Sequence, residues 1–147
     1  MSELYDKTAM MINDFVTEKG IKLKDVYDPE KKVWHLMRGS ALIDILLIVV
    51  PVSDTESREF LQIASPVAVV PKGKETLFYK RLLELNDVNL GVKLSLQPDT
   101  DQVWALFDRD LLGMSYSELK VCIEDLGYWA DEFDDLLSEE FGLEKPE

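Results

Sequence analysis

The sequence predicts an α+β fold in which helices pack on a mainly antiparallel, five-stranded sheet. Three observations indicate this class. Segments near both ends and in the middle of the chain repeat their apolar residues with the spacing of an α-helix. Other segments alternate in polarity or are continuously apolar, as strands are. Short turns rich in Gly, Pro and Asp join many of them. The resulting order is α-βββ-α-ββ-α.

The composition indicates one domain, spanning residues 1–147, with a strongly acidic surface. Acidic residues outnumber basic residues by 29 to 16, which gives a net charge of −13 at pH 7. This charge repels phosphate backbones and anionic membrane surfaces, so we expect neither nucleic acid nor a membrane as a partner. It fits a very soluble protein, or one whose partners are basic.

Several features of the sequence predict a cytoplasmic location. Cys122 is the single cysteine, so no intrachain disulfide can form. The N-terminal residues MSELYDKTAM lack the basic and apolar regions of a signal peptide. The longest apolar run, residues 41–52, contains Asp44 and Pro51 and is too short to span a bilayer.

The first predicted helix covers residues 2–19. Ser2 can act as its N-cap, and Gly20 ends it. Its apolar stripe comprises Leu4, Tyr5, Thr8, Met11, Ile12, Phe15 and Val16. We expect this stripe to pack in the core; the alternative is that part of it docks another chain. A polar segment, residues 21–32, follows and contains a turn at Asp28-Pro29.

Residues 33–38 and 41–50 are predicted to form a β-hairpin. If Gly39-Ser40 is a two-residue loop, register follows by counting outward from the turn. His35, the only histidine, then faces Asp44, the only charge in the apolar run. We therefore predict a cross-strand contact between these two side chains.

The second strand of this hairpin is apolar at almost every position. Such a strand is typically central and covered on both faces. Helices can cover one face, and in a chain of this size a second subunit could cover the other. The third predicted strand, residues 58–70, is interrupted at Ser65-Pro66. Because proline cannot donate a ladder hydrogen bond, the strand bulges there or lies at an edge.

A helix over residues 74–85 has Phe78, Leu82 and Leu85 on one side. Two alternating strands follow, over residues 92–97 and 103–108. The Pro-Asp-Thr-Asp turn between them predicts an antiparallel hairpin.

The last helix has the clearest start signal in the chain. Ser115 and Glu118 fit a capping box, and Met114 can pack on Leu119 as a hydrophobic staple. The apolar stripe of the helix keeps one face for about five turns. It consists of Leu119, Ile123, Leu126, Ala130, Phe133 and Leu137.

Candidate chemistry is sparse. His35 and Asp44 resemble an acid–base pair, but no nucleophile motif accompanies them, so we interpret them as a structural pair. The alternative is a small-ligand sensor or enzyme with a pocket near Trp34, His35 and Asp44. Cys122 is interpreted as a small packing residue. Nucleotide-binding, zinc-protease and redox motifs are absent from the sequence, and we expect no cofactor.

An acidic run near the C-terminus raises the question of a metal site. It comprises Asp131, Glu132, Asp134, Asp135, Glu139 and Glu140. A calcium loop needs a glycine-turned loop with alternating ligands, whereas these residues lie on a predicted helix. We therefore expect a solvated helix face, or a docking surface for a basic partner, and no metal ligands.

Three segments together resemble one protein family. They are RLLELNDVNLGVKLSL (81–96), VWALFDRDL (103–111) and YWADEFDDLLSEEFG (128–142). Their order and the helices and strands predicted for them are similar to those of the YbjN family, described as bacterial sensory transduction regulators. That family shares the fold of the type III secretion chaperones, and the resemblance extends over nearly the whole chain.

The resemblance implies a homodimeric, cytoplasmic protein that binds an unidentified protein partner and lacks enzymatic activity. In the secretion chaperones, the helix between the third and fourth strands helps to form the dimer interface. By position, this implies an interface that includes Phe78, Leu82 and Leu85. The chaperones also hold a partner segment in extended form, sometimes as an added strand. Because YbjN-like proteins occur without secretion machinery, that client role does not follow directly. We therefore expect a homodimeric regulator or chaperone-like adaptor.

Overall fold

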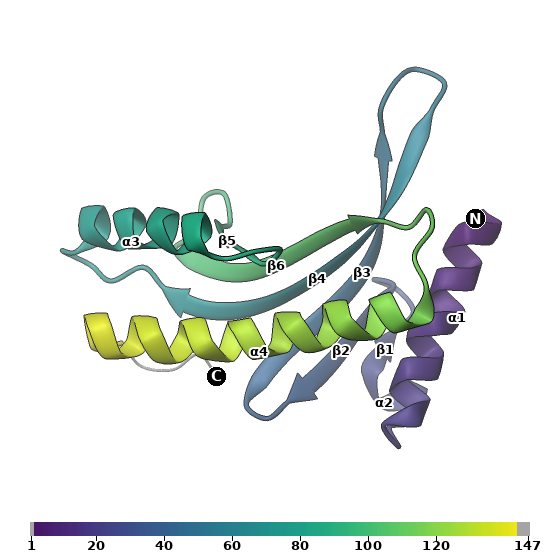
Figure 1. Ribbon diagram of the computed structural model, residues 1–147, viewed down its shortest axis with the longest axis horizontal. Helices are drawn as coiled ribbons and strands as arrows, with labels where there is room; N and C mark the ends of the chain where they lie inside the picture. The colour runs from purple at the N-terminus through teal and green to yellow at the C-terminus, as the bar shows by residue number, and fades with distance from the viewer. Residues whose placement is uncertain (1, 144–147) are drawn as a thin grey trace.

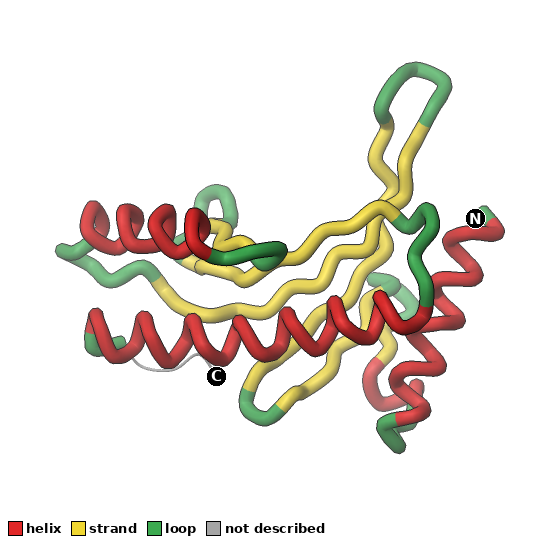
Figure 2. The backbone as a smooth tube through the Cα atoms, in the orientation of Figure 1, coloured by secondary structure: helices red, strands yellow, loops and turns green. Residues whose placement is uncertain are grey.

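The computed structural model describes residues 2–143, which form four helices and one six-stranded antiparallel sheet (Figures 1 and 2). The sheet order is β1-β2-β3-β4-β6-β5. Its strands are β1 (Tyr27–Asp28), β2 (Val33–Arg38), β3 (Ala41–Pro51), β4 (Ser57–Val69), β5 (Lys93–Leu96) and β6 (Gln102–Asp110). The helices are α1 (Glu3–Glu18), α2 (Leu23–Val26), α3 (Glu75–Val88) and α4 (Tyr116–Phe141).

The predicted α+β class and the order of the long elements are confirmed, but the predicted number of strands is wrong. The sheet has six strands because β1 adds a short edge beside β2, and α2 precedes it. Both elements lie in the polar segment 21–32 and are too short to show a periodic pattern. Tertiary packing defines β1: Tyr27 pairs with Trp34, and the two ring centroids are 4.7 Å apart.

The three long helices contribute to one core on a single face of the sheet. The longest helix, α4, packs on β4 and β6, α3 lies beside β5, and α1 packs against α4 (Figure 1). The inward side chains of the sheet are buried against them: Ile43, Ile45, Leu61, Ile63, Leu94, Val103 and Ala105. Burying one large apolar side chain contributes roughly 1.5–3 kcal/mol relative to leaving it exposed, so this layer accounts for much of the stability.

The predicted helix stripes are largely confirmed. All residues of the α4 stripe are buried: Leu119, Ile123, Leu126, Ala130, Phe133 and Leu137. In α1 the buried positions are Tyr5, Thr8, Ile12, Phe15 and Val16, whereas Leu4 and Met11 are only half-buried. Ser2 caps α1 by accepting a hydrogen bond from the Tyr5 N–H at 3.0 Å.

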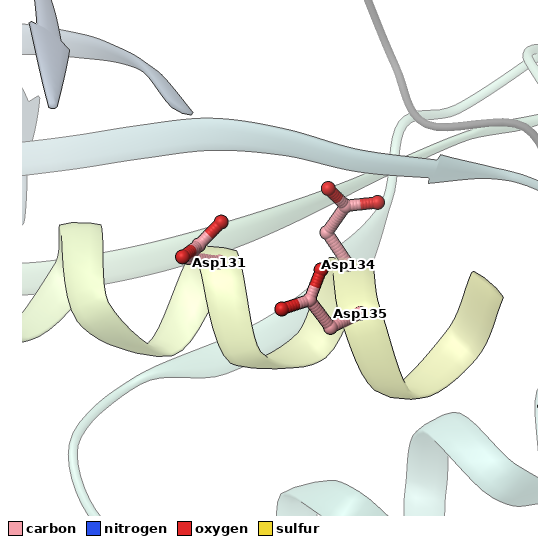
Figure 3. Close-up of side chains that lie close together, drawn as sticks. All are labelled: Asp131, Asp134 and Asp135. Carbon is pink, nitrogen blue, oxygen red and sulfur yellow. The ribbon is translucent and has the colours of Figure 1, made fainter. Parts of the chain in front are cut away.

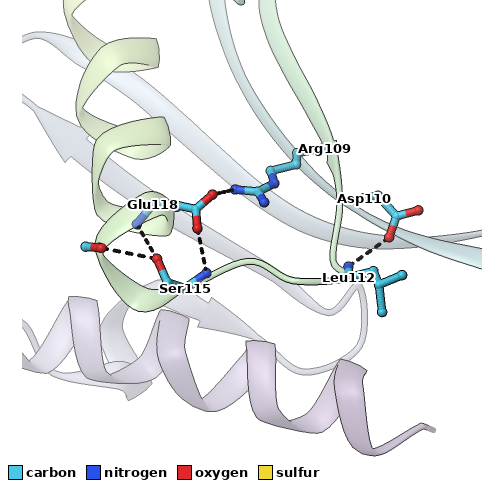
Figure 4. A network of polar contacts seen from close by, with 6 residues as sticks. Arg109, Asp110, Leu112, Ser115 and Glu118 are labelled. Carbon is cyan, nitrogen blue, oxygen red and sulfur yellow. Dashed lines mark hydrogen bonds and ion pairs between the residues drawn. The ribbon is translucent and has the colours of Figure 1, made fainter.

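Polar contacts fix the loop between β6 and α4 (Figure 4). The Ser115 hydroxyl accepts a hydrogen bond from the Glu118 N–H at 3.2 Å, and the Glu118 carboxylate accepts one from the Ser115 N–H at 3.3 Å. This is the predicted capping box. Arg109 pairs with Glu118, and Asp110 accepts a hydrogen bond from the Leu112 N–H at 2.8 Å. Together these contacts connect the end of β6 to the first turn of α4.

The predicted hairpin register is also confirmed. Arg38 pairs with Ala41, and His35 pairs with Asp44. The ladder between β4 and β6 shifts between Pro66 and Ala68, which is the predicted bulge. Because β4 lies between β3 and β6, this interruption is inside the sheet and not at an edge. The far end of the β3–β4 hairpin projects away from the rest of the molecule (Figure 2).

β3 is a central strand, as predicted, but it is not covered on both faces. Its inward residues Ile43 and Ile45 are buried, whereas the outward residues Leu46 and Ile48 are only half-buried. Neighbouring side chains on the same outer face give partial shielding, and no helix of residues 2–143 packs over them. The apolar run specified a central position but not what would cover its second face.

Candidate partner-binding surface

The outer face of the sheet carries an apolar patch that spans its central strands. Strand register places side chains from β3, β4 and β6 next to one another on this face. We call Leu46, Ala64, Trp104 and Leu106 the outer patch. Ala64 is buried by its neighbours, and the other three are half-buried. These are the side chains that alternate with the inward core residues, so the same register builds both faces.

The outer patch contains a depression of about 320 Å³. Its lining combines the patch with polar side chains and the β5–β6 turn: Asp44, Leu46, Gln62, Ala64, Ser95, Gln97, Pro98, Trp104 and Leu106. A shallow apolar surface with a polar border is the usual composition of a protein-binding site.

Ion pairs and hydrogen bonds border the outer patch on two sides. On one side His35 Nδ1 lies 2.6 Å from Asp44 Oδ1. On the other side Asp108 contacts the Lys93 ammonium at 2.7 Å and accepts a hydrogen bond from the Gln62 amide at 2.9 Å. These contacts hold the polar side chains in defined positions around the apolar surface.

Trp104 supplies the patch with an unsatisfied donor. Its indole Nε1 is buried and has no hydrogen-bond partner among the described residues. Leaving a buried N–H unpaired costs about 1–3 kcal/mol, and because this atom has no exposed surface, an acceptor from a bound molecule would reach it only if the indole moved. In the sequence, Trp104 and Leu106 alternate with Val103, Ala105 and Phe107 along one predicted strand. Large apolar residues on both faces of this strand were the signal that its outward face is also used.

The predicted pocket near Trp34, His35 and Asp44 is not present as one site. Trp34 and His35 are neighbours in β2, so their side chains point to opposite faces of the sheet. Trp34 is buried in the core, where its indole N–H donates to Asn13 Oδ1 at 2.9 Å. His35 is exposed on the outer face, where it contacts Asp44 as predicted. Asp44 lines the depression on the outer patch.

A second cleft, of about 300 Å³, lies where α1, the β2–β3 hairpin and α4 meet. It is lined by Phe15, Lys19, Ile21, Leu36, Met37, Arg38, Ile43, Ile123 and Glu124. Glu124 lies 3.0 Å from the Lys19 ammonium and 3.3 Å from Arg38 Nε. The hydrogen bond from Lys19, with a further one from Arg38, lowers the pKa of Glu124 despite its partial burial. The cleft is therefore apolar with a charged, exposed rim.

The three residues predicted for a dimer interface face the core of the chain. Phe78, Leu82 and Leu85 are buried within a single chain. The Phe78 ring packs edge-on against the Phe141 ring, with the two ring centroids 4.9 Å apart. They therefore have almost no surface left to share with a second subunit. The amphipathic pattern of α3 located a buried face, but that face packs on the chain's own core. Several of its other apolar residues are exposed: Leu77, Tyr79, Leu83 and Val88, with Leu90 just beyond the helix.

The acidic run of α4 is only partly the solvated face that the sequence predicts. Glu132, Asp135, Glu139 and Glu140 are exposed and Asp131 is half-buried, whereas Asp134 is only 8% exposed. Position 134 borders the stripe that contains Ala130, Phe133 and Leu137, which turns its carboxylate toward the sheet. Counting charges along the helix did not distinguish this inward acid from its solvated neighbours.

Cys122 is half-buried on α4, as expected for a small packing residue. Burial raises the pKa of its thiol, so the thiol stays protonated at neutral pH. A protonated thiol is a poor nucleophile and a poor metal ligand. Within residues 2–143 no helix is both long and apolar enough to cross a bilayer.

No protein-family model matches this sequence, and no curated protein matches it. Several solved structures match this chain. A chain of the ExsC–ExsE complex matches with a TM-score of 0.68 and 17% identity, over 93% of this chain and 97% of that one. YbjN from E. coli matches with a TM-score of 0.63 and 15% identity, over 92% and 93% of the two chains.

A third match is to a chain of the complex between the Yersinia pestis type III secretion chaperone SycH and a fragment of YscM2. Its TM-score is 0.55 at 15% identity, over 85% of this chain and 98% of that one. This chain has the fold of YbjN and the type III secretion chaperones. The resemblance seen in the sequence is thereby confirmed for the fold. At these identities the likeness concerns architecture, and the side chains of this chain must support any function.

Proposed function

We propose that this protein is a non-enzymatic protein-binding module that acts as a homodimeric regulator or chaperone-like adaptor. The observation that carries this proposal is the outer patch, which nothing in residues 2–143 covers. A shallow apolar depression that spans three neighbouring strands favours an extended protein segment as its occupant. Matching chains in the ExsC–ExsE and SycH–YscM2 complexes come from assemblies of two proteins, which supports the same class of function.

The outer patch suggests the chemistry of the partner segment. An apolar side chain would fill the depression between Leu46 and Leu106, and a small shift of the Trp104 indole would let a backbone carbonyl accept its N–H. An extended segment offers both groups together, because its side chains and carbonyls alternate along the chain. The net charge of −13 favours basic residues beside the apolar anchor.

We place the contact between two copies on the exposed residues of α3. Leu83 is 70% exposed, and Val88 and Leu90 are more exposed still. Leu83 and Val88 line one exposed surface of α3 together with Lys80, Arg81, Glu84 and Asp87, and such a mixed apolar and charged helix surface suits a second copy of the same helix. This assignment keeps α3 as the dimer element and replaces the buried residues with exposed ones.

Affinity capture with three matched baits tests the partner-binding proposal. Leu106→Glu places a charge in the outer patch, whereas Val121→Glu places the same charge on an exposed position of α4 away from it. We expect a protein that is enriched with the wild type and with Val121→Glu and is lost with Leu106→Glu. Identical sets of proteins on all three baits would contradict binding through the outer patch. Thermal unfolding monitored by circular dichroism verifies that both variants are folded.

A further inference from the structure

Three carboxylates gather on one side of α4. Asp131, Asp134 and Asp135 each offer an oxygen atom, and these atoms all lie within 4.8 Å of one another. Figure 3 shows the Asp131 and Asp134 carboxylates directed toward the strands that α4 covers. Carboxylates this close repel one another, and a cation among them converts that repulsion into attraction.

An independent observation on β4 points to an occupant at the same place. Ser65 is completely buried, and its Oγ has no hydrogen-bond partner among the described residues. Together with Asp131 and Asp134, Ser65 lines a cavity of about 10 Å³. A cavity of this size holds one water-sized occupant. An unpaired buried hydroxyl costs about 1–3 kcal/mol, so an occupant that contacts the Ser65 oxygen is favoured.

Backbone and side-chain contacts orient these groups. The β4 ladder shifts register between Pro66 and Ala68, immediately after Ser65, and such bulges redirect neighbouring side chains. Asp134 Oδ1 accepts a hydrogen bond from the Ser138 hydroxyl at 3.2 Å, one turn further along α4. Partners of this kind hold a ligating carboxylate in a fixed orientation.

We propose that Asp131, Asp134, Asp135 and Ser65 bind a hard divalent cation, Ca²⁺ or Mg²⁺, between α4 and β4. The donor set consists of three anionic carboxylates and one hydroxyl, which are the oxygen ligands that these ions prefer. The cluster contains no imidazole or thiolate, so its chemistry does not suit Zn²⁺ or Cu²⁺. A cation here fastens the C-terminal half of α4 to the bulge in β4. This site is separate from the outer patch and does not depend on the proposed partner.

Titration of the full chain with CaCl₂ and, separately, MgCl₂ tests the proposal by calorimetry and thermal unfolding at constant ionic strength. Three variants accompany the wild type. Asp134→Asn removes a buried ligand charge, and Ser65→Ala removes the hydroxyl while leaving the net charge at −13. Glu132→Gln is the matched control, because it removes one charge from an exposed position of the same helix.

We expect saturable binding of one of the two ions by the wild type and by Glu132→Gln, with a raised unfolding temperature. Asp134→Asn and Ser65→Ala should each weaken that binding by at least about tenfold, the scale of loss seen even for outer-shell partners. Ser65→Ala should leave the ion-free unfolding temperature unchanged, because its hydroxyl has no hydrogen-bond partner within residues 2–143 to lose. Equal responses of all four proteins to both ions would show diffuse attraction to an acidic surface and would overturn the site.

Discussion

His35 Nδ1 lies 2.6 Å from Asp44 Oδ1, across the hairpin of β2 and β3 and on the outer face of the sheet. The contact follows directly from the two-residue turn at Gly39-Ser40, which aligns the two positions. Both side chains are partly open to water, with 49% of the histidine and 29% of the aspartate exposed. The pair therefore borders the outer patch instead of forming a buried dyad.

A double-mutant cycle on this pair should give a small coupling free energy. Exposed pairs are screened by water and lose side-chain entropy when they form, so we expect less than about 1 kcal/mol between His35→Ala and Asp44→Ala. The coupling free energy is measured by urea unfolding of the wild type, both single variants and the double variant. Trp34→Ala, one residue away but buried, should cost about 3–5 kcal/mol. A coupling of several kcal/mol would contradict this description of the pair.

Gly127 lets α4 approach the β2–β3 hairpin, and alanine there should destabilise the protein. An added Cβ would lie 2.5 Å from Arg38 Cδ and 3.1 Å from Ile43 Cδ1. Displacing Arg38 also disturbs its contact with Glu124, so we expect Gly127→Ala to cost about 1–3 kcal/mol, the usual range for overpacking.

Removing Arg38 provides the control for this prediction. In an Arg38→Ala background the main obstruction is gone, and the gain in helix propensity of up to about 1 kcal/mol should offset most of the cost of Gly127→Ala. Denaturant unfolding measures the free-energy cost of Gly127→Ala in the wild-type background and in the Arg38→Ala background. The same loss in both backgrounds would show that Arg38 is not the obstacle.

Glu118 should contribute to stability at neutral pH and less in acid. The hydrogen bond from Arg109, with further ones from Ser115, lowers the pKa of Glu118 in the folded protein. A carboxyl group whose pKa is lowered by folding stabilises fully above its unfolded pKa. That contribution is lost as the pH falls through the folded value. The difference in unfolding free energy between wild type and Glu118→Gln should therefore be largest near pH 7 and shrink in acid. A difference that grows on acidification would contradict the assigned cause.

Adjacent residues of α3 should respond in opposite ways to the same substitution. Leu82→Asp places a charge in the core and should abolish cooperative unfolding, since buried unpaired charges are among the most destabilising changes. Leu83→Asp lies on the exposed side, so it should leave the chain folded while converting the proposed dimer to a monomer. Light scattering measures the mass. A monomeric wild type would contradict the homodimer, and a dimeric Leu83→Asp would move the interface away from α3.

Local patterns in the sequence were sufficient for most of the fold. The capping box at Ser115, the turn at Gly39-Ser40 and the bulge at Pro66 each reflect chemistry contained in a few neighbouring residues. β1 was missed because two residues carry no periodicity, and its position depends on Trp34. The burial of Asp134 was missed for a related reason, since only the packed helix shows which acid faces the sheet.

The surfaces were less predictable than the elements. The apolar face of α3 was identified correctly, but its pattern is the same whether the face packs on its own core or on a second subunit. The outer patch likewise depends on strand register across β3, β4 and β6, which unites Leu46, Trp104 and Leu106 from distant parts of the chain.

The dissociation constant of a captured partner, measured for the wild type, Leu106→Glu and Val121→Glu, tests the central claim most directly. If the outer patch binds the partner, Leu106→Glu should weaken binding by at least about tenfold, which corresponds to about 1.4 kcal/mol. Val121→Glu should bind as tightly as the wild type, because it adds the same charge elsewhere. Equal dissociation constants for all three proteins would contradict binding at the outer patch.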